Sequence, residues 1–207
     1  MHVIVPVVEN RLHLMQLCAI TDRKRMTQSL LHMVEDWSNG GVNFIQLREK
    51  DLDAPALQSL AQKVSARIDR SRSKLLVNVP APEWAALARA ANADGVHLAG
   101  PPRPDAAAII RRCFPEAIIS LPCHSVDDVA AAVVQRAHLI LFSPVFEKLS
   151  RQPQGLEGLR HACSAAQGIP VFALGGVTAV NALECVAAGA TGIAAIRLFM
   201  EDDWRRI

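Results

Sequence analysis

Residues 168–199, GIPVFALGGVTAVNALECVAAGATGIAAIRLF, decide the fold of this chain. The run Pro170–Leu174 is apolar with branched residues, and a glycine pair ends it. Thr178–Ala188 then has helical spacing, and Gly192–Ile196 is apolar again. This order predicts a strand, a glycine turn, a helix and a second strand. Two buried strands joined through a helix lie parallel in one sheet.

The glycine pair, Gly175 and Gly176, directly follows the first of these strands. Glycines at this place let the backbone approach a ligand and point successive N–H groups at it, which suits a phosphate or a carboxylate. A glycine pair is also common in tight turns that bind nothing. In a (β/α)8 barrel, however, the loops after the seventh and eighth strands frequently form a phosphate site. Whether the glycine pair is a phosphate site therefore depends on whether six more strand-helix units precede it.

Apolar runs typical of strands alternate with helical patterns along the rest of the chain. The six further predicted strands are Leu17–Ile20, Val42–Leu47, Leu75–Val77, Gly95–Leu98, Ile118–Leu121 and Leu139–Phe142. The helices predicted between them are Met26–Ser38, Ala54–Arg72, Pro80–Ala93, Pro104–Cys113, Val126–Ala137 and Leu156–Gln167. Eight strands alternating with helices predict an α/β fold, a parallel (β/α)8 TIM barrel. The alternative, an open doubly wound sheet, usually carries a phosphate loop at its first βα turn, and this turn contains no glycine.

Length and composition favour one domain over residues 1–207, with residues 1–15 as an N-terminal extension over the barrel bottom or a neighbouring subunit. The net charge of +2 and the scattered Lys and Arg residues argue against nucleic acid as a partner. No apolar run reaches the roughly 18 residues of a membrane span. The absence of a recognisable leader and the odd, widely spaced cysteines predict a reduced, cytoplasmic protein. A second copy of the chain, forming a homodimer, is the expected protein partner.

Polar side chains gather where predicted strands end, which is where a barrel keeps its chemistry. Gln46, Arg48 and Lys50 alternate along an extended segment and are expected to share one direction. Two cations and an amide on one side make a clamp for phosphate or pyrophosphate. The alternative is a solvated strand end, with Arg48 paired to Glu49 or to an acid of an adjacent loop.

Two histidines lie close to the predicted strand ends. His124 follows the fifth strand, and histidine is the side chain that accepts and donates protons near neutral pH. A lone histidine is more often structural, so position at the same rim as a phosphate site is what makes His124 a candidate acid/base. His97 lies inside the fourth strand and is predicted to be a hydrogen-bonded core residue.

Several motifs in a fixed order carry a family resemblance. CAITD, FIQLREK, ADGVHL, CHS, LFSPVFE with QGLEGL, IPVFALGGVTAVN and AGATGIAAI together resemble the thiamine phosphate synthase and thiazole tautomerase (TenI-like) family. The resemblance covers the chain from Leu17 to Phe199. It implies a (β/α)8 barrel, a thiazole phosphate ligand and a role in thiamine biosynthesis.

The resemblance implies two chemistries and a set of site residues. The synthase joins an aminopyrimidine pyrophosphate to the thiazole phosphate with Mg²⁺ on the pyrophosphate, whereas the tautomerase moves a proton on the thiazole phosphate carboxylate with a histidine and no metal. His124 matches the tautomerase acid/base. The substrate and phosphate site implied by the resemblance comprises Gln46, Arg48, Lys50, Asn78, Ser143, Gly175, Gly176, Ala195 and Arg197.

The chain departs from the synthase pattern at the expected metal ligands. Asn78 is followed by Val79 and Pro80 where the synthase has Asn-Asp-Arg, and His97-Leu98 is followed by Ala-Gly-Pro-Pro where it has Gly-Gln-x-Asp. Mg²⁺ usually takes one or two carboxylates beside substrate phosphates, so that site lacks its acids. Arg197 replaces a small residue and either reaches the phosphate or fills the pocket.

These departures favour a metal-independent tautomerase, an isomerase that needs no cofactor. The retained cations and Gln46 argue for the alternative, a thiamine phosphate synthase of the transferase class, for which Mg²⁺ would be required. A non-catalytic protein that binds thiamine phosphate is the third hypothesis.

Overall fold

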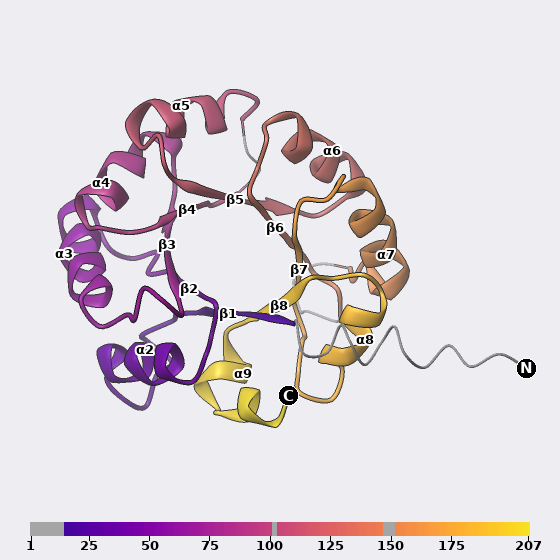
Figure 1. The fold of residues 1–207 in the computed structure, drawn as a ribbon, viewed down its shortest axis with the longest axis horizontal. Coiled ribbons are helices and arrows are strands. Elements are labelled where there is room, and N and C mark those ends of the chain that lie inside the picture. The colour runs from indigo at the N-terminus through magenta and orange to yellow at the C-terminus, as the bar shows by residue number, and fades with distance from the viewer. Residues whose placement is uncertain (1–14, 101–102, 147–151) are drawn as a thin grey trace, which may run out of the picture.

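The chain folds as a closed barrel of eight parallel strands in the order β1-β2-β3-β4-β5-β6-β7-β8, as a computed structural model shows. The structure describes residues 15–100, 103–146 and 152–207. Helices surround the strands on the outside, so the predicted (β/α)8 barrel is confirmed (Figure 1). The expectation for the N-terminal extension falls outside the described residues.

The elements follow the predicted alternation closely. The strands are β1 Gln16–Ile20, β2 Phe44–Leu47, β3 Lys74–Val79, β4 Gly95–Leu98, β5 Ile118–Cys123, β6 Leu139–Phe142, β7 Val171–Leu174 and β8 Gly192–Ala195. The helices are α2 Leu30–Asn39, α3 Ala54–Ser65, α4 Ala85–Ala90, α5 Ala106–Cys113, α6 Val126–Val134, α7 Gly155–Ala165, α8 Ala182–Ala187 and α9 Arg197–Met200, with 3-10 turns η1 Pro82–Trp84 and η2 Asp203–Arg206.

The strands bury side chains on both faces. One cluster consists of strand residues and includes Ile20, Leu76, Leu141 and Phe172, which fill the barrel interior. A larger cluster joins the intervening strand residues, such as Val77, to the surrounding helices. Because side chains alternate along a strand, a residue two positions beyond an interior residue also faces the interior. By this rule, polar side chains near the strand ends also face the barrel interior.

Most helices are shorter than predicted, and in two of them a polar side chain accounts for the difference. The predicted helix Ala54–Arg72 ends as α3 at Ser65, because the Asp69 carboxylate accepts hydrogen bonds from the amide and hydroxyl of Ser71 and stabilises a turn. The predicted helix Thr178–Ala188 is α8, Ala182–Ala187, because the Asn181 side chain accepts from the Thr178 amide at 2.8 Å.

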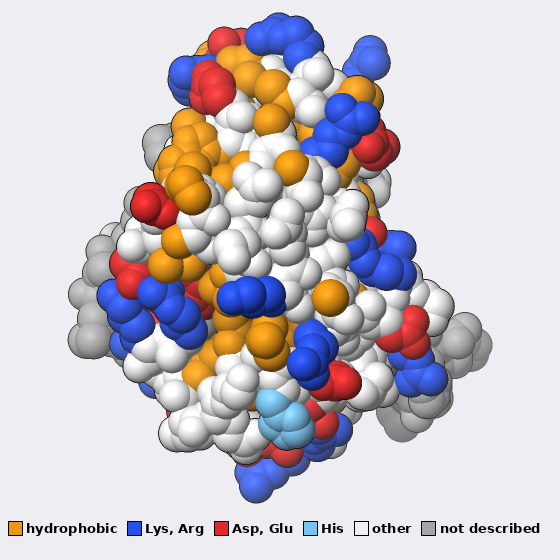
Figure 2. All heavy atoms as spheres, turned by 90° about the vertical axis from the view of Figure 1, so that its left-hand side faces the viewer, with side chains coloured by type: hydrophobic (Ala, Val, Ile, Leu, Met, Phe, Trp, Pro, Cys, Tyr) orange, Lys and Arg blue, Asp and Glu red, His pale blue; other side chains and the backbone are white. Residues whose placement is uncertain are grey.

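The outer face around α3 carries charges of both signs. Basic and acidic side chains alternate over this face (Figure 2), with ion pairs such as Arg67–Glu35 at 3.1 Å and Arg103–Glu83 at 3.0 Å. Among the helices that the structure describes, none combines the length and the apolar character that crossing a membrane would require.

Candidate active site at the C-terminal rim

A pair of amides lies in the barrel interior near the ends of β2 and β3. The Asn78 Nδ2 group donates to Gln46 Oε1 at 3.2 Å, and Gln46 is only 1% exposed. The Gln46 Nε2 group is buried and has no hydrogen-bond partner among the described residues. A buried donor without an acceptor is costly, so it marks a place where a ligand acceptor would be stabilising.

The next strands contribute a buried histidine and a serine. His97 Nδ1 lies 2.8 Å from Ser120 Oγ, which agrees with the prediction of a hydrogen-bonded core residue. Burial, with smaller contributions from the positive charges of Arg48 and protonated His124, lowers the pKa of His97 to about 3. The imidazole is therefore neutral near pH 7.

The His124 ring is held by the loop after β6. His124 Nδ1 lies 2.6 Å from the Ser143 carbonyl oxygen, an acceptor that requires the proton to be on Nδ1. In the neutral ring this leaves the Nε2 lone pair to accept a proton. The His124 backbone is also held, since its amide donates to Asp128 Oδ2 at 2.7 Å. Ser125 Oγ in turn accepts from the Asp128 amide and caps α6.

Cys123, the neighbour of His124, is not a second reactive group. Its side chain is buried at the end of β5. Burial raises the pKa of the Cys123 thiol to about 12, with a smaller effect of the Asp128 carboxylate. Because the thiolate is the nucleophile, this cysteine is inert near neutral pH.

The glycine pair lies against the same loop that holds His124. Gly175 and Gly176 have φ values of +96° and +69°, the left-handed region that favours glycine. A Cβ on Gly175 would stand 2.8 Å from Pro144 Cα, so the chain after Ser143 contacts this loop directly. Because Ser143 also accepts from His124, the histidine and the glycine pair open onto one rim.

The amides of the glycine loop are available to a ligand. Among the described residues, none accepts a hydrogen bond from the N–H of Gly175 or Gly176. The loop is held through its carbonyl groups instead, since Gly175 O accepts from the Phe146 amide at 3.0 Å and Gly176 O from Asn181 Nδ2 at 3.0 Å. Consecutive free amides in this conformation form an anion-binding concavity.

Arg48 does not pair with the adjacent acid. Glu49 turns to the other side of the extended segment and binds Thr21 Oγ1 at 2.7 Å and Arg23 Nη1 at 2.8 Å, so the alternative of an Arg48–Glu49 pair is wrong. No carboxylate in the described part of the chain pairs with the half-buried Arg48 side chain. Lys50 is exposed two residues further on.

The end of β8 carries the last two predicted site residues. Ala195 is buried at the strand end, and Arg197 is exposed as the first residue of α9. This exposure leaves the Arg197 guanidinium accessible from solvent. Arg197 forms no ion pair with the described acids, so its guanidinium can bind an anion at the rim.

The donor set at this rim does not suit Mg²⁺. The position of the first missing acid carries Val79, which has no oxygen ligand in its side chain, and the position of the second, Pro102, lies outside the described residues. Glu49 and Asp51 are engaged by Arg23. Within the described ranges, no group of three or more His, Cys, Asp and Glu side chains is placed to hold a metal ion.

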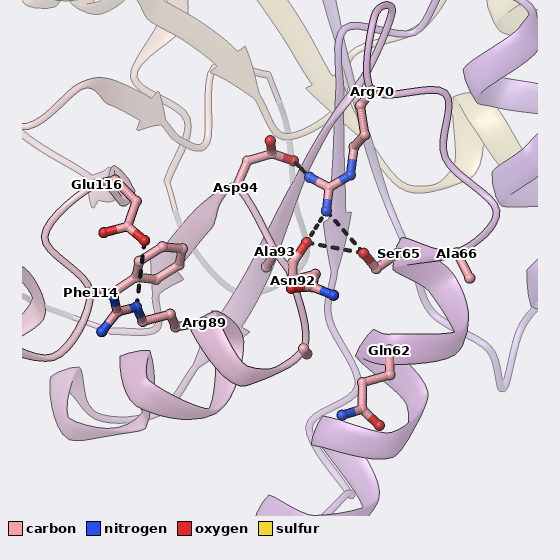
Figure 3. A pocket seen from close by; sticks show the side chains of 11 residues that line it. Gln62, Ser65, Ala66, Arg70, Arg89, Asn92, Ala93, Asp94, Phe114 and Glu116 are labelled. Carbon is pink, nitrogen blue, oxygen red and sulfur yellow. Dashed lines mark hydrogen bonds and ion pairs between the residues drawn. The ribbon is translucent and has the colours of Figure 1, made fainter.

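A pocket with a volume of about 690 Å³ lies at the opposite end of the barrel. Its charged groups point at one another (Figure 3): Arg70 binds Asp94 and the Ser65 hydroxyl, and Arg89 lies 3.4 Å from Glu116. Asp94 immediately precedes β4, so this is the N-terminal end of the strands, where residues of TIM barrels serve stability. The pocket is therefore structural.

The structure thus brings Gln46, Arg48, Asn78 and His124 together at one rim with the glycine loop. The sequence reasoning missed the groups that hold them, namely Thr21, Glu49, Ser120 and Asp128. A capping pattern, Ser125 followed three residues later by Asp128, was the one local signal available.

The fold and this rim define a (β/α)8 barrel protein with a glycine loop after its seventh strand and a histidine beside that loop. The chain belongs to the thiamine monophosphate synthase family of thiamine biosynthesis, whose family model matches residues 17–199. A protein of Aquifex aeolicus, provisionally named thiamine-phosphate synthase 2, is 37% identical over 92% of this chain and 100% of its own length. The thiamine-phosphate synthase of Chlorobium luteolum is 36% identical over 87% of this chain and 82% of its own length.

Solved structures agree with this assignment. The thiamine phosphate pyrophosphorylase of Pyrococcus furiosus superposes with a TM-score of 0.79 at 27% identity, covering 95% of this chain and 93% of that one. The names of these relatives correspond to the synthase, which sequence analysis held as the alternative to the tautomerase.

Proposed function

We propose that the chain binds a thiazole phosphate at the C-terminal rim and that His124 transfers a proton on the bound ring. The observation that carries this proposal is the His124–Ser143 contact of 2.6 Å, which orients the imidazole and leaves Nε2 as the base. The phosphate would be bound by the amides of Gly175 and Gly176, with Arg197 as a further donor. Phosphate suits such a concavity because the amides supply partial positive charge without a bound metal.

The proton transfer would begin with neutral His124. Nε2 would take a proton from the thiazole ring, and the Ser143 carbonyl oxygen would stabilise the imidazolium through the Nδ1–H bond. The same nitrogen would then return the proton at the alternative ring position, which completes an isomerisation. A positioned acid/base of this kind contributes about 10²- to 10⁴-fold to a rate. Arg48 and the buried Gln46 Nε2 would bind the carboxylate of the ring substituent.

Synthase activity is the second candidate function. It is favoured by the names of the relatives and by the pyrophosphate-type residues Gln46, Arg48 and Asn78, which the structure gathers in one place. The lack of carboxylates suited to Mg²⁺ counts against it. The two candidates therefore make opposite predictions about the need for the divalent ion.

One experiment separates these candidates. Purified protein is incubated with the thiazole phosphate carboxylate, with and without the aminopyrimidine pyrophosphate and Mg²⁺, and both the tautomer ratio and thiamine phosphate are followed. We expect tautomerisation in EDTA and no thiamine phosphate. Metal-dependent formation of thiamine phosphate would establish the synthase instead. Tight binding without either reaction would leave a non-catalytic binding protein.

A variant tests the role of His124 itself. His124→Asn retains a side-chain donor for the Ser143 carbonyl oxygen but has no base. We expect its tautomerisation rate to fall by about 10²-fold or more while ligand affinity stays within about tenfold, because the residue acts on the proton and not on the phosphate. His32→Ala, which changes an exposed histidine on α2, is the matched control.

A further inference from the structure

A buried hydrogen-bond network joins the Arg48 backbone to the loop after β1. Thr21 is fully buried, and its hydroxyl acts in two directions. The Oγ1 atom accepts from the Arg48 amide at 2.9 Å and donates to Glu49 Oε1 at 2.7 Å. The Thr21 amide donates to the Gln46 carbonyl oxygen at 2.9 Å. A single residue thus fixes the backbone on both sides of Leu47, where β2 ends.

The carboxylate in this network is deeply buried. The Glu49 side chain is 2% exposed, and it also accepts from the Arg23 amide at 3.1 Å and from Arg23 Nη1 at 2.8 Å. A buried carboxylate is tolerated only when such donors surround it. Arg23 also binds Asp51 through two contacts of 2.7 Å. Both acids that flank Arg48 and Lys50 in sequence are therefore occupied by Arg23.

This arrangement separates Arg48 from the acid next to it in sequence. Glu49 faces the β1 loop, whereas Arg48 lies on the other side of the extended segment and pairs with no carboxylate of the described residues. We propose that Thr21 and Glu49 are positioning residues that hold the Arg48 backbone and thereby aim its guanidinium at the substrate anion. This inference rests on the proposed function of the rim, because it assigns to Arg48 the binding of an anionic group.

The test measures binding of inorganic pyrophosphate by isothermal titration calorimetry in metal-free buffer, with the full chain and a set of single and double variants. Arg48→Ala should weaken binding by about 10- to 100-fold, the usual range for a hydrogen bond to a charged group. Thr21→Val removes the hydroxyl and should weaken binding by about 5- to 20-fold. Thr21→Ser restores the hydroxyl and should stay within about twofold of wild type.

The double variant Thr21→Val/Arg48→Ala distinguishes positioning from general damage. If Thr21 acts through Arg48, the Thr21→Val change should alter affinity by less than about twofold once Arg48 is absent. If Thr21→Val does not fold, Glu49→Gln, which keeps the side-chain shape, is measured alone and combined with Arg48→Ala in the same way. Equal losses in both backgrounds, or no loss in either, would overturn the inference. Unchanged affinity of Arg48→Ala for pyrophosphate would also overturn the inference, but it would leave the proposed site at the glycine loop intact. If wild type does not bind pyrophosphate, both the proposed anion site and this inference are wrong.

Discussion

At the scale of single residues, the rim depends on one backbone conformation, that of Gly175. Its φ of +96° would cost an alanine about 1–2 kcal/mol, and the added Cβ would also stand 2.8 Å from Pro144 Cα. We expect Gly175→Ala to lower the free energy of unfolding by about 2–4 kcal/mol and to abolish phosphate binding. Gly41→Ala is the control, because Gly41 has φ +92° with nothing within 4 Å. Equal destabilisation by both changes in urea titrations would show that the Pro144 contact is unimportant.

His97 makes the stability of the fold depend on pH. Burial lowers its pKa from the ordinary 6.5 to about 3, so between these values the unfolded chain binds the proton more readily than the folded chain. Stability is therefore lost as the pH falls from 6.5 towards 3. We expect wild type to lose about 1–2 kcal/mol more than His97→Gln between pH 7 and pH 5, measured by urea unfolding. Identical losses in the two proteins would contradict this assignment.

At the scale of elements, the strands could be predicted well because each strand of a parallel barrel is buried on both faces and forms a continuous apolar run. The predicted Gly95–Leu98 and Leu139–Phe142 agree fully with β4 and β6. Helix ends were predicted less well, since polar side chains near Asp69 and Asn181 form turns that compete with the helix. Such competition depends on which acceptor a side chain reaches, and periodicity does not report it.

At the site too, the strand pattern predicted which side a residue faces but not which residue it binds. The alternation of Gln46 and Arg48 placed both near the rim, since position along a strand determines the side that a residue faces. The partner of Glu49 could not be predicted, because Arg23 and Thr21 belong to another loop, 26 and 28 residues away in the chain. Adjacency favours an Arg48–Glu49 pair, whereas the extended backbone directs these side chains to opposite sides.

At the scale of the whole molecule, the barrel closes between β8 and β1, and the chain after β8 packs beside α2. After β8 the described chain forms only the four-residue α9 and the turn η2, which lie beside α2 (Figure 1). Trp204 anchors this segment: it is 5% exposed, stacks on Phe199 at 5.9 Å and carries Arg205 over its ring at 4.4 Å. Arg205 in turn binds Asp36 on α2. One aromatic side chain thus joins the segment after β8 to the core and to the end of α2.

This closure can be tested with a pair of changes across the Trp204 contact. Trp204→Ala should lower the free energy of unfolding by about 3–5 kcal/mol, whereas Trp204→Phe should cost less, because it keeps a ring and removes the unpaired indole N–H. Gly40 has an ordinary φ of −78°, but a Cβ there would meet the Trp204 ring at 2.3 Å. Gly40→Ala should therefore destabilise wild type by about 1–3 kcal/mol and be neutral or stabilising in the Trp204→Ala background. Additive effects of the two changes in thermal unfolding would mean that Trp204 does not occupy this position against α2.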